Sequence, residues 1–407
     1  MCDAVGELFR VGISRRRFLG GAAAAVGGAA ALRPSPAGAA TIPSQRSIEA
    51  TQIARDYPAR LVLLGTNGGP TWHVDREGIA SALFVDGHIY LVDCGEGVGR
   101  QLMLAQYQSA RPQENPPPVP PALDKLRAIF LTHLHSDHTI DYFNLFLYGW
   151  YQGLTEVQKP VQVFGPGNRG EMEPLFGGGK APPVMNPENP TPGTEEMTDY
   201  LYQAFATDEN DRMRDNHKPD LRKLVQVHDI KLPHIDAFKS PNATPTPPME
   251  PFVVFEDSRV KVHATLVHHA PIFPAFAFRF DTDHGSVVFS GDTSPCENLI
   301  RMAKGADVLV HEVIDMHFIN NLFPKPWNDL EKSLIHHLQA AHTTIEDVGG
   351  VAESAGVKKL VLTHIVPGNA PLPRLLQAQQ GFSGELIVGE DLMQIGIGRR
   401  RNGKGKG

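Results

Sequence analysis

Three histidines and one aspartate within six residues restrict this chain more than any other feature of its sequence. The apolar segment Arg127-Ala-Ile-Phe-Leu-Thr132 has the composition of a buried strand, and His133-Leu-His-Ser-Asp-His138 follows it directly. Imidazole and carboxylate groups at the end of a buried strand need partners, because unpaired polar groups are costly in a protein interior. Both groups are good ligands for zinc and similar divalent ions, so the segment predicts a metal site rather than a solvated loop.

Short apolar runs and longer periodic segments alternate along the rest of the chain. The runs that predict strands lie at 60–64, 82–85, 89–92, 127–132, 161–164, 260–267, 275–280, 286–290, 308–310 and 360–363. The segments that predict helices lie at 97–107, 142–151, 296–304 and 345–355. Each half of the chain therefore has strands followed by helices, which suits a core of two sheets with helices outside.

Two proline-rich stretches interrupt this pattern. Residues 112–121 contain six prolines and must form a loop. From about 165 to 251 the periodicity fades and prolines cluster, so we expect an insertion or cap there.

The two ends of the chain differ in composition from the body. Ser14-Arg-Arg-Arg-Phe-Leu19, an apolar run of Gly, Ala, Val and Leu, and Ala37-Gly-Ala39 occur in the order of a twin-arginine signal peptide. We expect cleavage after residue 39, a linker over 40–58, and a basic disordered tail over 399–407. The apolar run is shorter than the roughly 20 residues that span a membrane, so no stable membrane span is expected.

Charge separates the ends from the body as well. The chain has a net charge of −7; residues 1–39 carry +3 and residues 399–407 carry +5, which leaves −15 on residues 40–398. An acidic body is not typical of nucleic-acid binders, so nucleic acid is not expected as a partner. The three cysteines are too few for a disulfide scaffold, and Cys94 is interpreted as a small buried residue.

The histidine-rich segment resembles the hallmark H-x-H-x-D-H of the metallo-β-lactamase superfamily. Further matching motifs follow in the order of its ribonuclease Z and arylsulfatase-like branch: Asp93-Cys-Gly-Glu-Gly97, Val267-His-His-Ala-Pro271, Ser290-Gly-Asp-Thr293, His311-Glu312, His342-Thr-Thr344 and Thr363-His364. The resemblance implies an α/β fold, the four-layer αββα sandwich, over residues 59–398.

The resemblance also implies two divalent metal ions, with zinc expected. The first would be held by His133, His135 and His269, and the second by Asp137, His138 and His364, with Asp292 bridging them. His269 is preferred over its neighbour His268, because the family places this ligand just before a small-or-Pro turn like Ala270-Pro271.

The implied chemistry is ester hydrolysis by a metal-bridging hydroxide. Asp137 would orient or deprotonate the nucleophile, His342 would assist the leaving oxygen, and Glu312 would orient the His342 ring. Capping or packing roles for His342 and Glu312 are the alternative.

The sequence therefore predicts an exported hydrolase, periplasmic or extracellular, that acts on small phosphodiester or aryl sulfate esters. Its partners would be the small-molecule ester and the twin-arginine export machinery; the sequence leaves the oligomeric state open, and a homo-oligomer is compatible with it. Two alternatives remain: a ribonuclease Z-like endonuclease, and a mononuclear iron dioxygenase of the same fold.

Overall fold

Two β-sheets form the centre of the molecule in the computed structural model, which describes residues 56–109, 122–175 and 180–400. The first sheet has the strand order β14-β1-β2-β3-β4-β5-β6. Its strands are β1 Ala59–Gly65, β2 Ala80–Val85, β3 His88–Val92, β4 Leu126–Phe130, β5 Val161–Pro166, β6 Val225–Ile230 and β14 Gln394–Ile397.

The second sheet has the order β13-β12-β11-β10-β9-β8-β7. Its strands are β7 Phe252–Glu256, β8 Val260–Leu266, β9 Phe276–Thr282, β10 Gly285–Phe289, β11 Val308–Ile314, β12 Lys359–Val366 and β13 Glu385–Val388. Each sheet has three antiparallel strand pairs on one side and three parallel pairs on the other. The two halves of the chain thus repeat one strand pattern.

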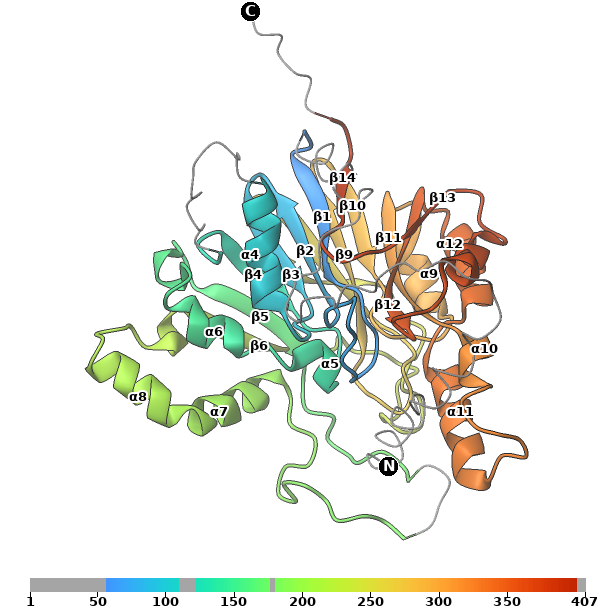
Figure 1. The fold of residues 1–407 in the computed structure, drawn as a ribbon. Helices are drawn as coiled ribbons and strands as arrows, with labels where there is room; N and C mark the ends of the chain where they lie inside the picture. Colours follow the sequence, from blue (N-terminus) through green and yellow to red (C-terminus); the bar gives the residue numbers. More distant parts are fainter. Residues whose placement is uncertain (1–55, 110–121, 176–179, 401–407) are drawn as a thin grey trace, which may run out of the picture.

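Helices lie on the outer face of each sheet, α4 and α6 on the first and α9 and α12 on the second (Figure 1). The helices are α4 Val98–Ser109, α5 Ser136–Thr139, α6 Asn144–Gly149, α7 Thr194–Ala204, α8 Ala206–Arg214, α9 Glu297–Ala303, α10 Met316–Ile319, α11 Asp329–Ala341, α12 Ile345–Ala355 and α13 Leu372–Leu375. Short 3₁₀ turns lie at Leu154–Glu156, Leu221–Lys223 and Leu376–Gln379.

Three apolar layers hold this arrangement together. Between the sheets, Phe130 contacts Phe278 and Phe280, with ring centroids 5.4 and 5.1 Å apart. The outer face of the first sheet packs against α4 and α6, and that of the second against α9 and α12. The predicted αββα sandwich is confirmed, because alternate residues of each strand supply the inner and outer layers.

The stretch 165–251 contains α7, α8 and β6. Strand β6 pairs in parallel with β5, so this stretch supplies the last strand of the first sheet. The sequence predicts no strand there, because three of the six β6 residues are only half-buried and the nearby prolines obscure the alternation.

Several predictions concern residues outside the described ranges. These are the signal peptide over 1–39, most of the linker over 40–58, the proline-rich loop over 112–121 and most of the basic tail. Within the described ranges, no helix is both long and apolar enough to cross a membrane.

Candidate metal centre

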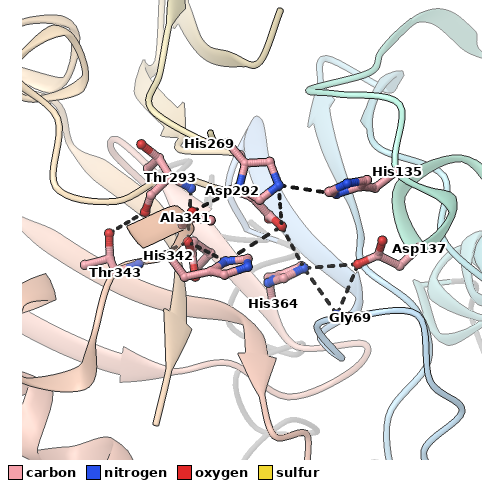
Figure 2. A network of polar contacts seen from close by, with 12 residues as sticks. Gly69, His135, Asp137, His269, Asp292, Thr293, Ala341, His342, Thr343 and His364 are labelled. Atoms are coloured by element: carbon pink, nitrogen blue, oxygen red, sulfur yellow. Dashed lines mark hydrogen bonds and ion pairs between the residues drawn. The ribbon is translucent and has the colours of Figure 1, made fainter. Parts of the chain in front are cut away.

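The predicted ligands meet at one edge of the sandwich, where strands from both sheets end. Strands β3 and β4 are parallel, and so are β10, β11 and β12, which brings their carboxyl ends to a common edge. Polar residues at such an edge can converge on a ligand, since the loops that leave the strands meet there. Figure 2 shows side chains from both halves of the chain pointing toward one another at this edge.

The first cluster joins His133, His135, His269 and Asp292, with one ligand atom from each within 4.8 Å of the others. The His135 Nδ1 atom lies 2.9 Å from His133 Nε2 and 3.2 Å from His269 Nε2. An Asp292 Oδ2 oxygen lies 3.9 Å from both His133 and His269 Nε2. Two bonds of 2.0–2.1 Å at a tetrahedral angle separate the ligand nitrogens by about 3.3 Å, so these imidazoles fit a shared zinc-sized ion.

The second cluster joins Asp137, His138, His364 and, again, Asp292. His364 Nε2 lies 3.2 Å from Asp137 Oδ2 and 3.3 Å from Asp292 Oδ2. His138 Nε2 lies 3.3 Å from Asp292 Oδ1 and 3.5 Å from Asp137 Oδ2. The two clusters are therefore joined through Asp292, the residue that sequence analysis places between the metals.

Unpaired buried atoms show that these residues suit a cation. His138 Nε2 and Asp292 Oδ1 are buried, and neither forms a well-directed hydrogen bond, although they lie 3.3 Å apart. Such atoms are costly in an interior unless a further group binds them. Their donor types and spacing fit divalent metal ions in both clusters.

The electrostatics of the two clusters differ. Burial lowers the pKa of His133 and of His269 well below the usual value, which favours the neutral ring that a metal needs. Burial also acts on His138, but the carboxylates of Asp292, Asp93 and Asp137 outweigh it and raise its pKa. The second cluster is thus the more carboxylate-rich of the two.

Residues behind the ligands fix the orientation of two rings. His138 Nδ1 donates to Asp93 Oδ2 over 2.8 Å, and the Thr132 amide donates to Asp93 Oδ1 over 2.8 Å. His269 Nδ1 donates to the carbonyl oxygen of Ala341 over 3.0 Å. In both rings the Nε2 atom is left to face the cluster, as in metal sites whose second ring nitrogen is hydrogen-bonded.

The choice between His268 and His269 agrees with the geometry. His269 is buried in the first cluster, whereas His268 is half-buried and its Nδ1 lies 3.2 Å from Thr246 Oγ1. Both residues lie in the segment that follows β8, and of the two only His269 belongs to a cluster.

His342 and Glu312 lie beside the clusters. His342 Nδ1 donates to Glu312 Oε1 over 3.0 Å, and the amides of Thr293 and Thr343 donate to the same oxygen. Although burial opposes it, the Glu312 carboxylate raises the pKa of His342 to about 9. The Glu312 carboxylate therefore holds the ring in a fixed orientation and favours its protonated form.

The backbone at the strand ends adopts uncommon conformations. Asp93 and His364 have φ values of +60° and +42°, in the left-handed region that residues other than glycine rarely adopt. A Cβ at Gly68 would lie 2.6 Å from His364 Nδ1, so only glycine permits this close approach. Strained backbone of this kind is frequent at functional sites.

Two contributions to the site were not predicted from the sequence. The Gly69 amide donates to Asp137 Oδ2 over 3.1 Å and lies 3.4 Å from His364 Nε2. Thr132 links Asp93 to the histidine-rich loop. The sequence signal that could have indicated the Gly69 contact is the Gly68-Gly69 pair that follows β1.

Cys94 and Cys296 are both free and buried, which agrees with the packing role predicted for Cys94.

Comparisons with known proteins agree with this geometry. The family described as the β-lactamase superfamily domain matches residues 218–365. Ribonuclease Z of Mycobacterium marinum is 28% identical over 344 residues, covering 84% of this chain and 99% of its own length. Ribonuclease Z of Mycobacterium sp. (strain KMS) is 29% identical over 342 residues, covering 83% and 95%. Human tRNase Z, short form, has a similar fold: TM-score 0.52, 20% identity, 83% of this chain and 99% of that one.

The chain has the metallo-β-lactamase fold and is a metal-dependent hydrolase that acts on ester bonds. Its relatives along most of its length are ribonucleases Z, whose name places their ester bonds in RNA. The fold implies bound divalent metal ions, and the His and Asp clusters are where this chain could hold them.

The expectation that nucleic acid is not a partner is wrong, because these relatives are ribonucleases. It relied on the charge of −15 over residues 40–398. Charges on a protein surface are screened over about 8–10 Å at physiological ionic strength, so the total charge does not determine the potential at one edge. The local charge at the site decides whether a phosphate can approach.

Proposed function

We propose that this protein is a ribonuclease Z-like endonuclease that hydrolyses phosphodiester bonds in RNA with two divalent ions, zinc being the expected metal. The observation that carries the proposal is the pair of clusters joined through Asp292. Support also comes from the ribonuclease Z relatives, of which the alignment covers 95–99%.

Both ions would be held by the residues of the two clusters, with Asp292 common to them. When bound, two adjacent divalent ions lower the pKa of water and neutralise charge on a phosphate. That chemistry fits the donor set, which is composed of imidazoles and carboxylates without a thiolate.

The remaining steps belong to the side chains around the clusters. Asp137 is ionised, since the positive charge of nearby imidazoles holds its pKa below the usual range despite burial. Its carboxylate, fixed by the Gly69 amide, accepts a hydrogen bond from the attacking water and orients it. His342 has its Nδ1 engaged by Glu312, so its Nε2 donates a proton to the leaving oxygen.

The test uses purified protein and four substrate types: RNA hairpins with a single-stranded 3′ extension, aryl phosphodiesters, aryl sulfates and lactones. We expect RNA cleavage together with close to two zinc ions per chain by elemental analysis. Asp137→Asn should lower kcat on RNA by roughly 10² or more, within the range of general-base catalysis.

Two outcomes would contradict the proposal. Turnover of small esters with no cleavage of RNA would favour the small-ester hydrolase predicted from the sequence. A single iron ion per chain, with oxygen consumption, would favour the dioxygenase alternative.

We also propose that the protein is exported by the twin-arginine route. Support comes only from the sequence, where Arg15 and Arg16 precede the apolar run. A reporter fused to residues 1–45 should cross the membrane, and changing both arginines to lysine should stop it. Undiminished export of the lysine variant would remove this assignment.

A further inference from the structure

A tryptophan lies exposed on a loop beside the metal clusters. Trp72 is 89% exposed, whereas Trp150 is 1% exposed and donates from Nε1 to the Pro219 carbonyl. An indole has a large apolar surface that usually packs in a core or an interface. Core packing therefore gives no reason for a tryptophan at position 72.

The loop that carries Trp72 is fixed at its base. The Asn67 amide donates to the Glu77 carbonyl over 3.0 Å, and the Asn67 side chain donates to the Thr71 carbonyl over 2.7 Å. Arg76 donates to the carbonyls of Gly368 and Gly389 over 2.7 and 2.9 Å. The tip of the loop, which carries Trp72 and the equally exposed Val74, therefore lies between two residues, Asn67 and Arg76, that are held by hydrogen bonds.

The same loop also contacts the second cluster. Gly69 donates to Asp137 and lies against His364, both in the second cluster. Trp72 follows three residues later, and three residues span at most about 10 Å. The Cα atom of Trp72 therefore lies at most about 10 Å from that of Gly69, whose amide contacts the second cluster.

We infer that Trp72 stacks on an unpaired nucleobase next to the phosphodiester bond that is cleaved. Stacking on an aromatic side chain needs an exposed ring face, tolerates any base and is not hindered by the acidic body of the protein. The inference rests on the proposed function and adds to it a residue of this chain that contacts the RNA beside the cleaved bond. Trp72 is a specificity-determining residue in this scheme and takes no part in the proton transfers.

The test compares wild-type protein, loaded with zinc, with Trp72→Ala and Trp72→Phe. The probes are an RNA hairpin with a single-stranded uridine 3′ extension and the same hairpin with an abasic extension. Loss of one stacked base corresponds to about ten- to hundredfold in affinity, so Trp72→Ala should lower kcat/KM on the uridine RNA by that factor. Trp72→Phe should keep most of the activity, and on the abasic RNA all three proteins should be equal.

A second readout does not depend on turnover. The uridine RNA should protect Trp72 from quenching by acrylamide, as measured by the fluorescence that Trp72→Phe lacks, and the abasic RNA should not. Tyr107→Ala, which removes an exposed aromatic ring near the far end of α4, is the matched control and should change neither readout.

The outcomes separate this inference from the proposed function. If wild type and Trp72→Ala cleave the uridine RNA equally well, the role of Trp72 is wrong and the ribonuclease proposal stands. If wild type cleaves bis(4-nitrophenyl) phosphate but neither RNA, both are overturned.

Discussion

The two sheets supply the metal clusters in different ways. The first sheet delivers four ligands within one short segment, His133–His138, directly after β4. The second delivers His269 and Asp292 from the segments that follow β8 and β10, and His364 from within β12. Each cluster nevertheless takes two residues from the first half and two from the second, sharing Asp292. Neither half holds a complete site, so the packing of the sheets and the assembly of the site are one event.

The largest effect on metal binding and activity is expected from a substitution at Asp292, because this residue belongs to both clusters. Asp292→Asn keeps the shape of the side chain but removes the charge shared by both clusters, and both metals should be weakened. Several kcal/mol of lost charge stabilisation corresponds to roughly 10³-fold or more in kcat/KM. Steady-state kinetics and elemental analysis on the same sample measure both effects.

The control for Asp292→Asn is Asp283→Asn, an exposed carboxylate in the β9–β10 turn at the opposite end of β10. It should keep wild-type activity and metal content, with both variants folded by circular dichroism. Two metals and near-normal activity in Asp292→Asn would mean that the two clusters do not depend on the charge of the carboxylate that they share.

This difference between clustered and dispersed ligands also explains which site residues could be predicted from the sequence. Four ligands adjacent in sequence, such as His133–His138, form a pattern that is visible without a structure. The ligands of the second half are single residues, and they were placed only through the resemblance to a family. The Gly69 contact depends on which loops become neighbours on folding, and no local pattern encodes that.

The same reasoning applies to the fold. Long apolar strands such as β1 and β8 were predicted closely, and α12 matches its predicted range. The four-residue strands β13 and β14 were missed, because so short a run has no measurable period. Helix α11 was missed as well, since only Ile335 and Ala341 of its residues are buried.

His342 has no counterpart in the first half and should have the next largest effect. If it protonates the leaving oxygen, His342→Ala should lower kcat by about 10²–10³ on RNA, within the range for a general acid. Nitrophenyl esters leave without protonation and should be affected far less. Equal losses on both substrate types would assign His342 a structural role.

The ligand rings of the two halves are oriented in different ways, and a substitution at Asp93 tests this difference. Asp93 fixes His138 through a side chain, whereas a backbone carbonyl fixes His269. Asp93→Asn should therefore lower the affinity of the second cluster for zinc by about 10- to 100-fold, as for other residues behind metal ligands. Competition with a chelating dye should show one weakened and one unchanged zinc. Equal weakening of both would mean that Asp93 supports the whole edge.

The smallest predicted effect is a shift in titration within the second half. Burial alone would lower the pKa of His342, and the Glu312 carboxylate reverses this and raises it to about 9. In metal-free protein, the ring should be protonated below that pH and neutral above it, as followed by NMR of the histidine ring protons.

Glu312→Gln keeps an oxygen for the Thr293 and Thr343 amides but removes the charge, so the pKa of His342 should fall toward or below the ordinary value of 6.5. Because the raised pKa stabilises the folded state only while the ring is protonated, the wild type should lose stability relative to Glu312→Gln as pH rises from 6.5 through 9. Unchanged titration in Glu312→Gln would show that Asp292 and Asp137, which also raise the pKa, hold the proton, and that His342 depends on both halves after all.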